Sequence, residues 1–155
     1  MRDDDAVARV YRPLGARVVS ATVGAVLVVL VAFLWLSLPA SVRDDFGTFQ
    51  RATLGGFFVI VLVLLYGIFR TRVTASGRGI TVTNGFRRHD FDWAEVVRIA
   101  LTQDRPWALA DLTDGSTVAL MALQTADGLR ARRSTRELSA MAADSTGPPG
   151  AAGTA

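Results

Sequence analysis

Two long uncharged stretches dominate the hydrophobic pattern of the first half of the chain. Residues 18–38 contain no charged side chain, and at about 1.5 Å of rise per helical residue they cover roughly the 30 Å hydrocarbon core of a bilayer. Residues 54–69 form a shorter stretch, which reaches about 27 Å when Ala52 and Thr53 are included and still spans a bilayer. We therefore predict two transmembrane helices, at 18–38 and 54–69.

Two other interpretations of these stretches are open. An apolar helix can form the core of a soluble protein, although the rest of this chain is too short to surround one. The first stretch also has features of a signal peptide, because Arg9, Arg12 and Arg17 precede it. Its apolar run is longer than that of a signal peptide, and Leu38 occupies a position where a small residue is expected before cleavage.

Beyond Phe69 the pattern changes to an alternation with period two. Short β-rich runs are separated by turns such as Asn84-Gly85 and Asp114-Gly115, and these two pairs are strong hairpin signals. The pattern predicts an antiparallel β region with strands at 71–75, 79–83, 86–91, 96–102, 107–112 and 117–123.

The hairpin around Asp114-Gly115 predicts a core face and a second apolar face. A two-residue turn pairs Leu112 with Thr117, and the residues that share the core face are then Trp107, Leu109, Val118 and Leu120. The opposite face is apolar too, and an exposed apolar patch usually marks an interaction site. The C-terminal helix, a second copy of the chain or another membrane subunit can cover this face, and we favour one of the two intermolecular covers. The interface candidates on this face are Ala108, Ala110, Leu112, Ala119 and Met121.

The hairpin around Asn84-Gly85 conflicts with simple alternation. A two-residue turn pairs Val82 with Arg87 and Ile80 with His89, which places charge on the apolar face. Two explanations are compatible with this pattern: a bulge shifts the register, or the charged side chains lie at the open end of the core and extend outward.

A helix is predicted at residues 125–142, with Thr125 as its N-cap. Its beginning at the Ser134–Glu137 capping box is the competing interpretation. Helical spacing places Ala131, Leu138 and Ala142 on one packing face. Residues 143–155 are rich in Pro, Gly, Ser, Thr and Ala, so we expect a disordered tail after a domain at 70–142.

The distribution of arginine predicts the orientation in the membrane. Arginines precede the first span, in the N-terminal segment 1–17, and follow the second span. The connecting loop 39–53 has only Arg43 and Arg51, with Asp44 and Asp45 beside them. By the positive-inside rule, the loop is external and both termini and the domain are cytoplasmic, as in a multi-pass protein of the cell membrane.

Composition narrows the chemistry that is possible. The chain of 155 residues has no cysteine and one histidine, His89, and all 17 of its basic residues are arginine. Thiolate metal sites, disulfides and cysteine nucleophiles are therefore excluded. Hydrolase, zincin and Walker motifs are absent from the sequence, and we expect no enzyme activity, no metal and no cofactor.

Several single features have two interpretations, of which we favour the structural one. Trp93 and Trp107 fit core aromatics better than a binding platform. Asp92 fits a turn cap better than one of a carboxylate pair with Asp90. The segment from Ser76 to Gly79 fits an ordinary hairpin turn better than an anion site, and His89 fits the edge of a strand better than a pH sensor.

Five arginines near the second span are candidates for binding anionic lipid or another anion: Arg70, Arg72, Arg78, Arg87 and Arg88. Each basic residue close to an anionic leaflet contributes about 1 kcal/mol of attraction. The alternative is that these arginines serve orientation alone. Nucleic acid is not an expected partner despite the pI of about 10.5, because the charge follows the membrane boundary and no recognition motif accompanies it.

The order of a membrane hairpin, a β meander and a short helix resembles a known family. The segments that carry the resemblance are GRGITVTNGFRRHDFDWAEVVRIAL and RPWALADLTDGSTVALMALQTADG. They resemble bacterial PH-like proteins of the low-molecular-weight-protein-antigen type, found in high-GC Gram-positive bacteria. The resemblance implies a PH-like antiparallel β split barrel closed by a C-terminal helix, without catalytic residues.

The resemblance also implies seven strands where the pattern shows six, so we expect a barrel that is incomplete or closed by a partner. The combined fold class is a membrane α-hairpin of two transmembrane helices plus a small α+β domain. As function we expect an integral membrane adaptor whose cytoplasmic PH-like module binds protein, itself included, or anionic lipid. The alternative is an accessory subunit of a larger membrane complex.

Overall fold

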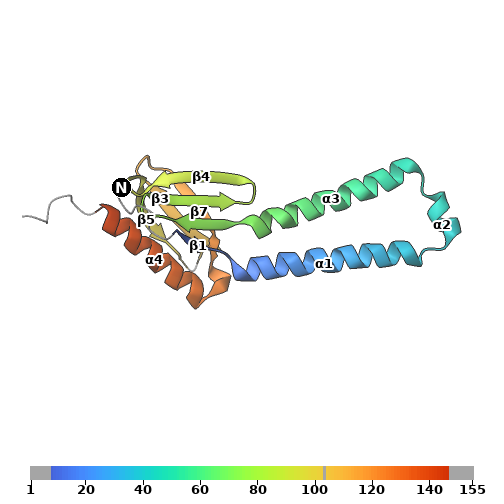
Figure 1. Cartoon of the computed structure of the whole chain (residues 1–155), viewed down its shortest axis with the longest axis horizontal. Helices are drawn as coiled ribbons and strands as arrows, with labels where there is room; N and C mark the ends of the chain where they lie inside the picture. Colours follow the sequence, from blue (N-terminus) through green and yellow to red (C-terminus); the bar gives the residue numbers. More distant parts are fainter. Residues whose placement is uncertain (1–7, 103, 147–155) are drawn as a thin grey trace, which may run out of the picture.

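The computed structural model describes residues 8–102 and 104–146. A long helical hairpin projects from one end of a small domain of strands and one helix (Figure 1). The hairpin consists of α1 (Leu14–Ser37) and α3 (Thr48–Arg70), joined at the far end by the short helix α2 (Ala40–Asp45). Both long helices exceed the predicted spans, because α1 begins before residue 18 and α3 begins at Thr48, within the predicted loop 39–53.

Both long helices are long and apolar enough to cross a membrane. In each, only 6% of the most apolar 18-residue window is buried. A core helix of a soluble protein is mostly buried, so this exposure argues against that interpretation. The two helices pack on each other through small residues such as Gly24, where an added Cβ would meet Leu65 at 3.7 Å.

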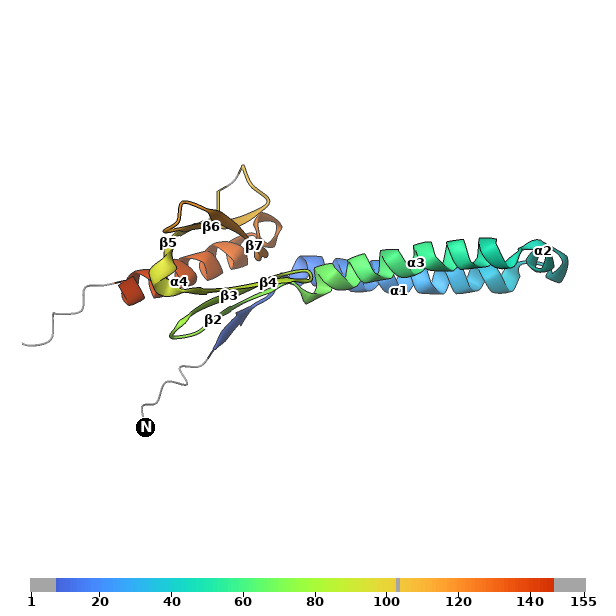
Figure 2. The same ribbon diagram turned by 90° about the horizontal axis from the view of Figure 1, so that it is seen from above.

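The domain contains two antiparallel sheets, which lie one above the other in Figure 2. The first has the order β1-β2-β3-β4 and the second the order β5-β6-β7. Their strands are β1 (Arg9–Tyr11), β2 (Arg72–Ala75), β3 (Gly79–Asn84), β4 (Arg87–Asp92), β5 (Val96–Ala100), β6 (Trp107–Leu112) and β7 (Thr117–Gln124).

Strand β1 is the seventh strand that the sequence pattern lacked. It precedes α1 and pairs antiparallel with β2, which follows α3, with Val10 opposite Thr74. The expectation of a barrel that is incomplete or completed by a partner was wrong on this point, because the chain's own N-terminal segment supplies the strand. Three residues before a long apolar helix carry too little periodicity to predict a strand.

Helix α4 (Leu129–Thr146) follows the 3₁₀ turn η2 (Thr125–Asp127) and Gly128. It therefore begins later than Thr125 and earlier than the Ser134 capping box. Ala131, Leu138 and Ala142 are buried as predicted, and Leu138 and Ala142 join a core built from both sheets. The predicted tail at 143–155 was wrong for residues 143–146, which are helical, while residues 147–155 lie outside the described part of the chain.

The turn of the β3–β4 hairpin lies one residue later than predicted, which shifts the strand pairing by two residues. Asn84 pairs with Arg87 and Val82 with His89, so the turn is Gly85-Phe86 rather than Asn84-Gly85. Gly85 has a φ of +61° at the first turn position, which fits the type II′ turn that glycine favours there. Strand β4 is an exposed edge, and its charged residues therefore remain in solvent without a bulge.

The β6–β7 hairpin corrects the predicted core face. Its loop is longer than two residues, and Gly115 at a φ of +81° completes it, as in hairpins with a glycine bulge. Asp111 rather than Leu112 pairs with Thr117, and this shift of one residue exchanges the two faces of β6.

The buried face of this hairpin therefore differs from both predicted sets. Trp107 and Leu109 are only partly buried, whereas Leu120 belongs to the core as predicted. The interface prediction was wrong for three of its residues, because the chain's own core buries them: Ala108, Ala110 and Leu112. Ala119 and Met121 lie on the outer face and are partly exposed.

Replacing Leu120 by alanine is expected to lower the free energy of unfolding by about 2–5 kcal/mol, because the side chain is fully buried. The matched variant Leu109→Ala is expected to cost less, since Leu109 is partly exposed. Denaturant unfolding of the full chain in detergent micelles, followed by tryptophan fluorescence, measures both. Equal costs would contradict the β6–β7 register.

Candidate functional site

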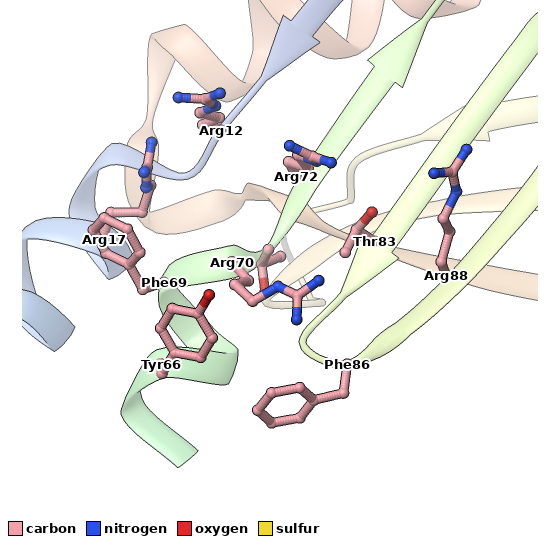
Figure 3. A pocket seen from close by; sticks show the side chains of 10 residues that line it. Arg12, Arg17, Tyr66, Phe69, Arg70, Arg72, Thr83, Phe86 and Arg88 are labelled. Atoms are coloured by element: carbon pink, nitrogen blue, oxygen red, sulfur yellow. The ribbon is translucent and has the colours of Figure 1, made fainter. Parts of the chain in front are cut away.

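A basic pocket lies where the helical hairpin joins the domain (Figure 3). Its volume is about 480 Å³. The lining residues come from the segment after β1, the first turn of α1, the end of α3, β2 and the β3–β4 hairpin: Arg12, Arg17, Tyr66, Phe69, Arg70, Thr71, Arg72, Thr83, Phe86 and Arg88. None of these lining residues is acidic.

The joint between α3 and β2 positions much of the pocket. Thr71 is the single residue between Arg70 and Arg72, and it is buried. Its hydroxyl donates to the Gly67 carbonyl (3.4 Å) and accepts from the Gly85 N–H (3.2 Å). This threonine therefore ties the end of α3 to the β3–β4 turn and holds the two neighbouring arginines on a short, ordered link.

Aromatic rings hold two of the arginines. The Arg17 guanidinium carbon lies 4.2 Å from the centroid of the Phe69 ring. The Arg70 guanidinium carbon lies 5.7 Å from the Tyr66 centroid and 5.9 Å from the Phe86 centroid. These are cation–π distances, and such stacking restrains a guanidinium while leaving its in-plane N–H groups free to donate.

Arg17 also carries an unsatisfied donor. Its Nε is buried and has no hydrogen-bond partner among the described residues. Leaving a buried donor unpaired costs about 1–3 kcal/mol, more for a charged group. Arg17 is therefore the residue of the pocket with the clearest need for an additional acceptor.

Ion pairing affects one lining arginine. Arg88 contacts Asp90 at 3.1 Å, and this hydrogen bond, followed by that from Thr81, lowers the pKa of Asp90 below its ordinary value. Within residues 8–102 and 104–146, no ion pair is recorded for Arg12, Arg17, Arg70 or Arg72. The positive charge of the pocket is thus largely uncompensated by the described part of the chain.

The β3–β4 turn brings Phe86 to the last turns of α3. The Phe86 and Tyr66 ring centroids are 6.5 Å apart, and a Cβ added at Gly67 would lie 2.9 Å from the Phe86 ring. Phe86 is 57% exposed. An exposed aromatic ring beside the end of an apolar helix is typical of the interfacial layer of a membrane.

The structure brings together three of the five predicted arginines. Arg70, Arg72 and Arg88 line the pocket. Arg78 lies at the β2–β3 turn, in a separate cavity with the carboxylates Asp90, Asp92 and Glu95, and Arg87 does not line the basic pocket. Sequence reasoning missed Arg12 and Arg17 as site residues, because it used them only to orient the first span.

The remaining candidates have structural surroundings. Trp93 is buried and its indole N–H donates to the Ser76 carbonyl at 2.8 Å. Asp92 caps the 3₁₀ turn η1 (Trp93–Glu95), and its N–H donates to the Glu95 carboxylate at 2.8 Å. His89 is exposed and stacks on Phe91 at 6.1 Å.

Further contacts attach β1 to α4. The Tyr11 hydroxyl donates to the Glu137 carboxylate at 3.3 Å, and burial, followed by the charge of Glu137, raises the pKa of Tyr11. Arg9 also lies 3.9 Å from Glu137. The N-terminal segment that carries Arg12 is therefore attached to both β2 and α4.

Acidic and histidine side chains in the described part of the chain form no group of three or more that could hold a metal ion.

Comparison with known proteins identifies the domain. Residues 70–140 match the family model of the bacterial PH domain. No curated protein and no solved structure matches the chain. The matched residues cover β2 to β7 and most of α4, so the strand β1 and the helical hairpin lie outside the family model. The match to the family model, together with the two antiparallel sheets and the C-terminal helix, shows that residues 70–140 form a bacterial PH-like domain.

Proposed function

We propose that the protein is an integral membrane adaptor that holds its PH-like module at the inner leaflet of the cell membrane. In this proposal α1 and α3 span the bilayer, both termini are cytoplasmic, and the module binds a protein, a second copy included, or anionic lipid. PH-like domains are in general non-catalytic modules, which supports a binding function rather than an enzymatic one.

The observation that carries the proposal is the pairing of β1 with β2. Because β1 precedes α1 and β2 follows α3, both ends of the hairpin return to one sheet and lie on the same side of a bilayer that the hairpin spans. Only Thr71 separates α3 from β2. The module is therefore attached rigidly at the bilayer surface, instead of being tethered by a flexible linker.

Charge and aromatic residues support the orientation. Arginines cluster at the domain end of the hairpin, whereas Arg43 and Arg51 at the α2 end have Asp44 and Asp45 as neighbours in the sequence. This asymmetry favours the domain end as the cytoplasmic end. Trp35, near the α2 end, contacts Phe46 edge to face at 5.9 Å, as expected for aromatic residues at the opposite interface.

An accessory subunit of a larger membrane complex is the second candidate function. Gly55 and Gly56 on α3 have no atom within 4 Å of an added Cβ, which leaves room for close approach of another helix. The outer face of the β6–β7 hairpin carries the polar pair Asp111 and Thr117 and a partly exposed apolar group: Trp107, Leu109, Ala119 and Met121. Both surfaces fit contacts with neighbouring subunits.

Reporters that fluoresce only in the cytoplasm are expected to give signal when fused to either terminus, because the arginine-rich end of the hairpin faces the cytoplasm. An epitope placed between α2 and α3 is expected to be accessible from outside intact cells. Loss of signal at both termini would contradict the orientation alone. Loss at one terminus only would contradict the β1–β2 pairing as well.

The variant Met121→Arg is expected to keep the circular dichroism of the wild type, since Met121 is partly exposed, and to dissociate a complex or oligomer in mild detergent, because a charge buried without a partner is strongly disfavoured. Size-exclusion chromatography with light scattering measures the mass. Leu129→Arg is the matched control, as Leu129 is 83% exposed and belongs to α4 rather than to this hairpin. An unchanged mass for Met121→Arg would remove the outer face as an interface.

A further inference from the structure

The arrangement of the arginines exceeds what membrane orientation requires. The positive-inside rule requires basic residues near the cytoplasmic ends of the spans, but it does not require them to share a cavity. Here residues far apart in the sequence, such as Arg12, Arg70 and Arg88, line one pocket without an acidic lining residue. Like charges that converge in this way repel each other, so the arrangement is favourable when an anion is present.

Arg17 and Arg70 show that the pocket is built to hold guanidinium groups in place. Phe69 stacks on Arg17, and Tyr66 and Phe86 flank Arg70. Stacked guanidinium groups keep their N–H donors in a fixed fork, which matches the oxygens of a phosphate. The buried Nε of Arg17 has no acceptor among the described residues, and an oxyanion in the pocket would supply one.

The position of the pocket along the hairpin indicates which kind of molecule carries the anion. Tyr66 and Phe69 belong to the last turns of α3, and the exposed ring of Phe86 lies beside them (Figure 3). If α3 spans the bilayer, these rings lie at the boundary of the acyl chains. The arginines on the domain side of the rings then lie at the depth of the lipid phosphates.

We propose that this pocket binds the phosphate of one anionic phospholipid of the inner leaflet. Arg17, Arg70 and Arg72 donate to the phosphate oxygens, and Phe69 and Phe86 pack against the apolar part of the same lipid. The bound lipid thereby joins the N-terminal segment, the end of α3 and the first sheet. The assignment to the inner leaflet rests on the proposed function, whereas the phosphate site itself rests on the pocket.

Titration of the full chain in neutral detergent with phosphatidylglycerol, followed by native mass spectrometry, tests the site without reference to orientation. We expect one retained phosphatidylglycerol per chain, in preference to phosphatidylcholine. Arg17→Gln and Arg72→Gln are each expected to weaken binding about tenfold, the effect of losing one charge-assisted hydrogen bond. Arg17→Lys keeps the charge but loses the planar fork, and is expected to weaken binding as well.

Arg78→Gln and Arg87→Gln are the matched controls, because each removes the same charge from outside the pocket. Both are expected to bind as the wild type does. Equal losses in pocket and control variants, or equal retention of the two lipids, would overturn the site. Displacement of the lipid by inorganic phosphate at comparable concentration would overturn the lipid as the source of the phosphate.

The circular dichroism and thermal unfolding of each variant are measured in parallel. Arg72 is exposed on β2, so its replacement keeps the test valid if Arg17→Gln unfolds. Wild-type binding by a folded Arg72→Gln variant would also overturn the proposed contacts. Lipid binding in micelles together with an inverted topology in cells would refute the inner-leaflet adaptor but not the phosphate site. No lipid binding in micelles together with the expected topology in cells would refute the phosphate site but not the adaptor.

Discussion

The short pairing of β1 with β2 is the constraint on which the rest of the molecule depends. These two strands stand on either side of the helical hairpin in the sequence, and their backbone pairing brings both hairpin ends to one sheet. A strand of three residues contributes few hydrogen bonds, but other contacts reinforce it. Tyr11 reaches Glu137 on α4, and the Gly15 N–H donates to Asp127 at 3.2 Å. The helices and the domain are consequently joined along several segments.

This joint gathers the arginines near the domain end of the hairpin into one pocket. Arginines at the ends of two long helices would ordinarily be dispersed over a solvated surface. Because β1, α3 and β2 converge, the arginines beside them line one cavity. The apolar rings of Phe69 and Phe86 then supply faces on which guanidinium groups stack. The site therefore belongs neither to the hairpin nor to the PH-like domain alone.

The two sheets of the domain are also joined by a side chain whose role the local sequence pattern does not predict. The pattern places Asn84 in a turn, whereas in the structure it is the last residue of β3. Its side-chain amide accepts a hydrogen bond from the Met121 N–H and donates one to the Ala119 carbonyl of β7. This side chain links the first sheet to the second, and Ile80, Leu120 and Leu138 fill the core between them and α4. The PH-like match at residues 70–140 covers this core, while β1 completes the sheet from outside it.

The sequence by itself determined the features that follow from local composition. The uncharged runs predicted two long apolar helices, the alternation after Phe69 predicted six of the seven strands, and Ala131, Leu138 and Ala142 were correctly assigned to the packing face of the last helix. It also pointed to Arg70, Arg72 and Arg88, which line the pocket, since basic residues beside an uncharged run can be found without a fold. These features depend on periodicity and charge within a few residues of each other.

Only the tertiary structure decided register, the seventh strand and the composition of the pocket. The strand pairing is shifted by two residues in the β3–β4 hairpin and by one residue in the β6–β7 hairpin, and Gly85 and Gly115 at positive φ complete the two turns. The one-residue shift reverses the faces of β6 and buries Ala108, Ala110 and Leu112. Arg12 and Arg17 joined the pocket because β1 pairs with a strand some sixty residues later in the chain. Pairing between distant segments depends on the packing of the whole domain, and a turn type depends on backbone angles that neighbouring residues alone do not specify.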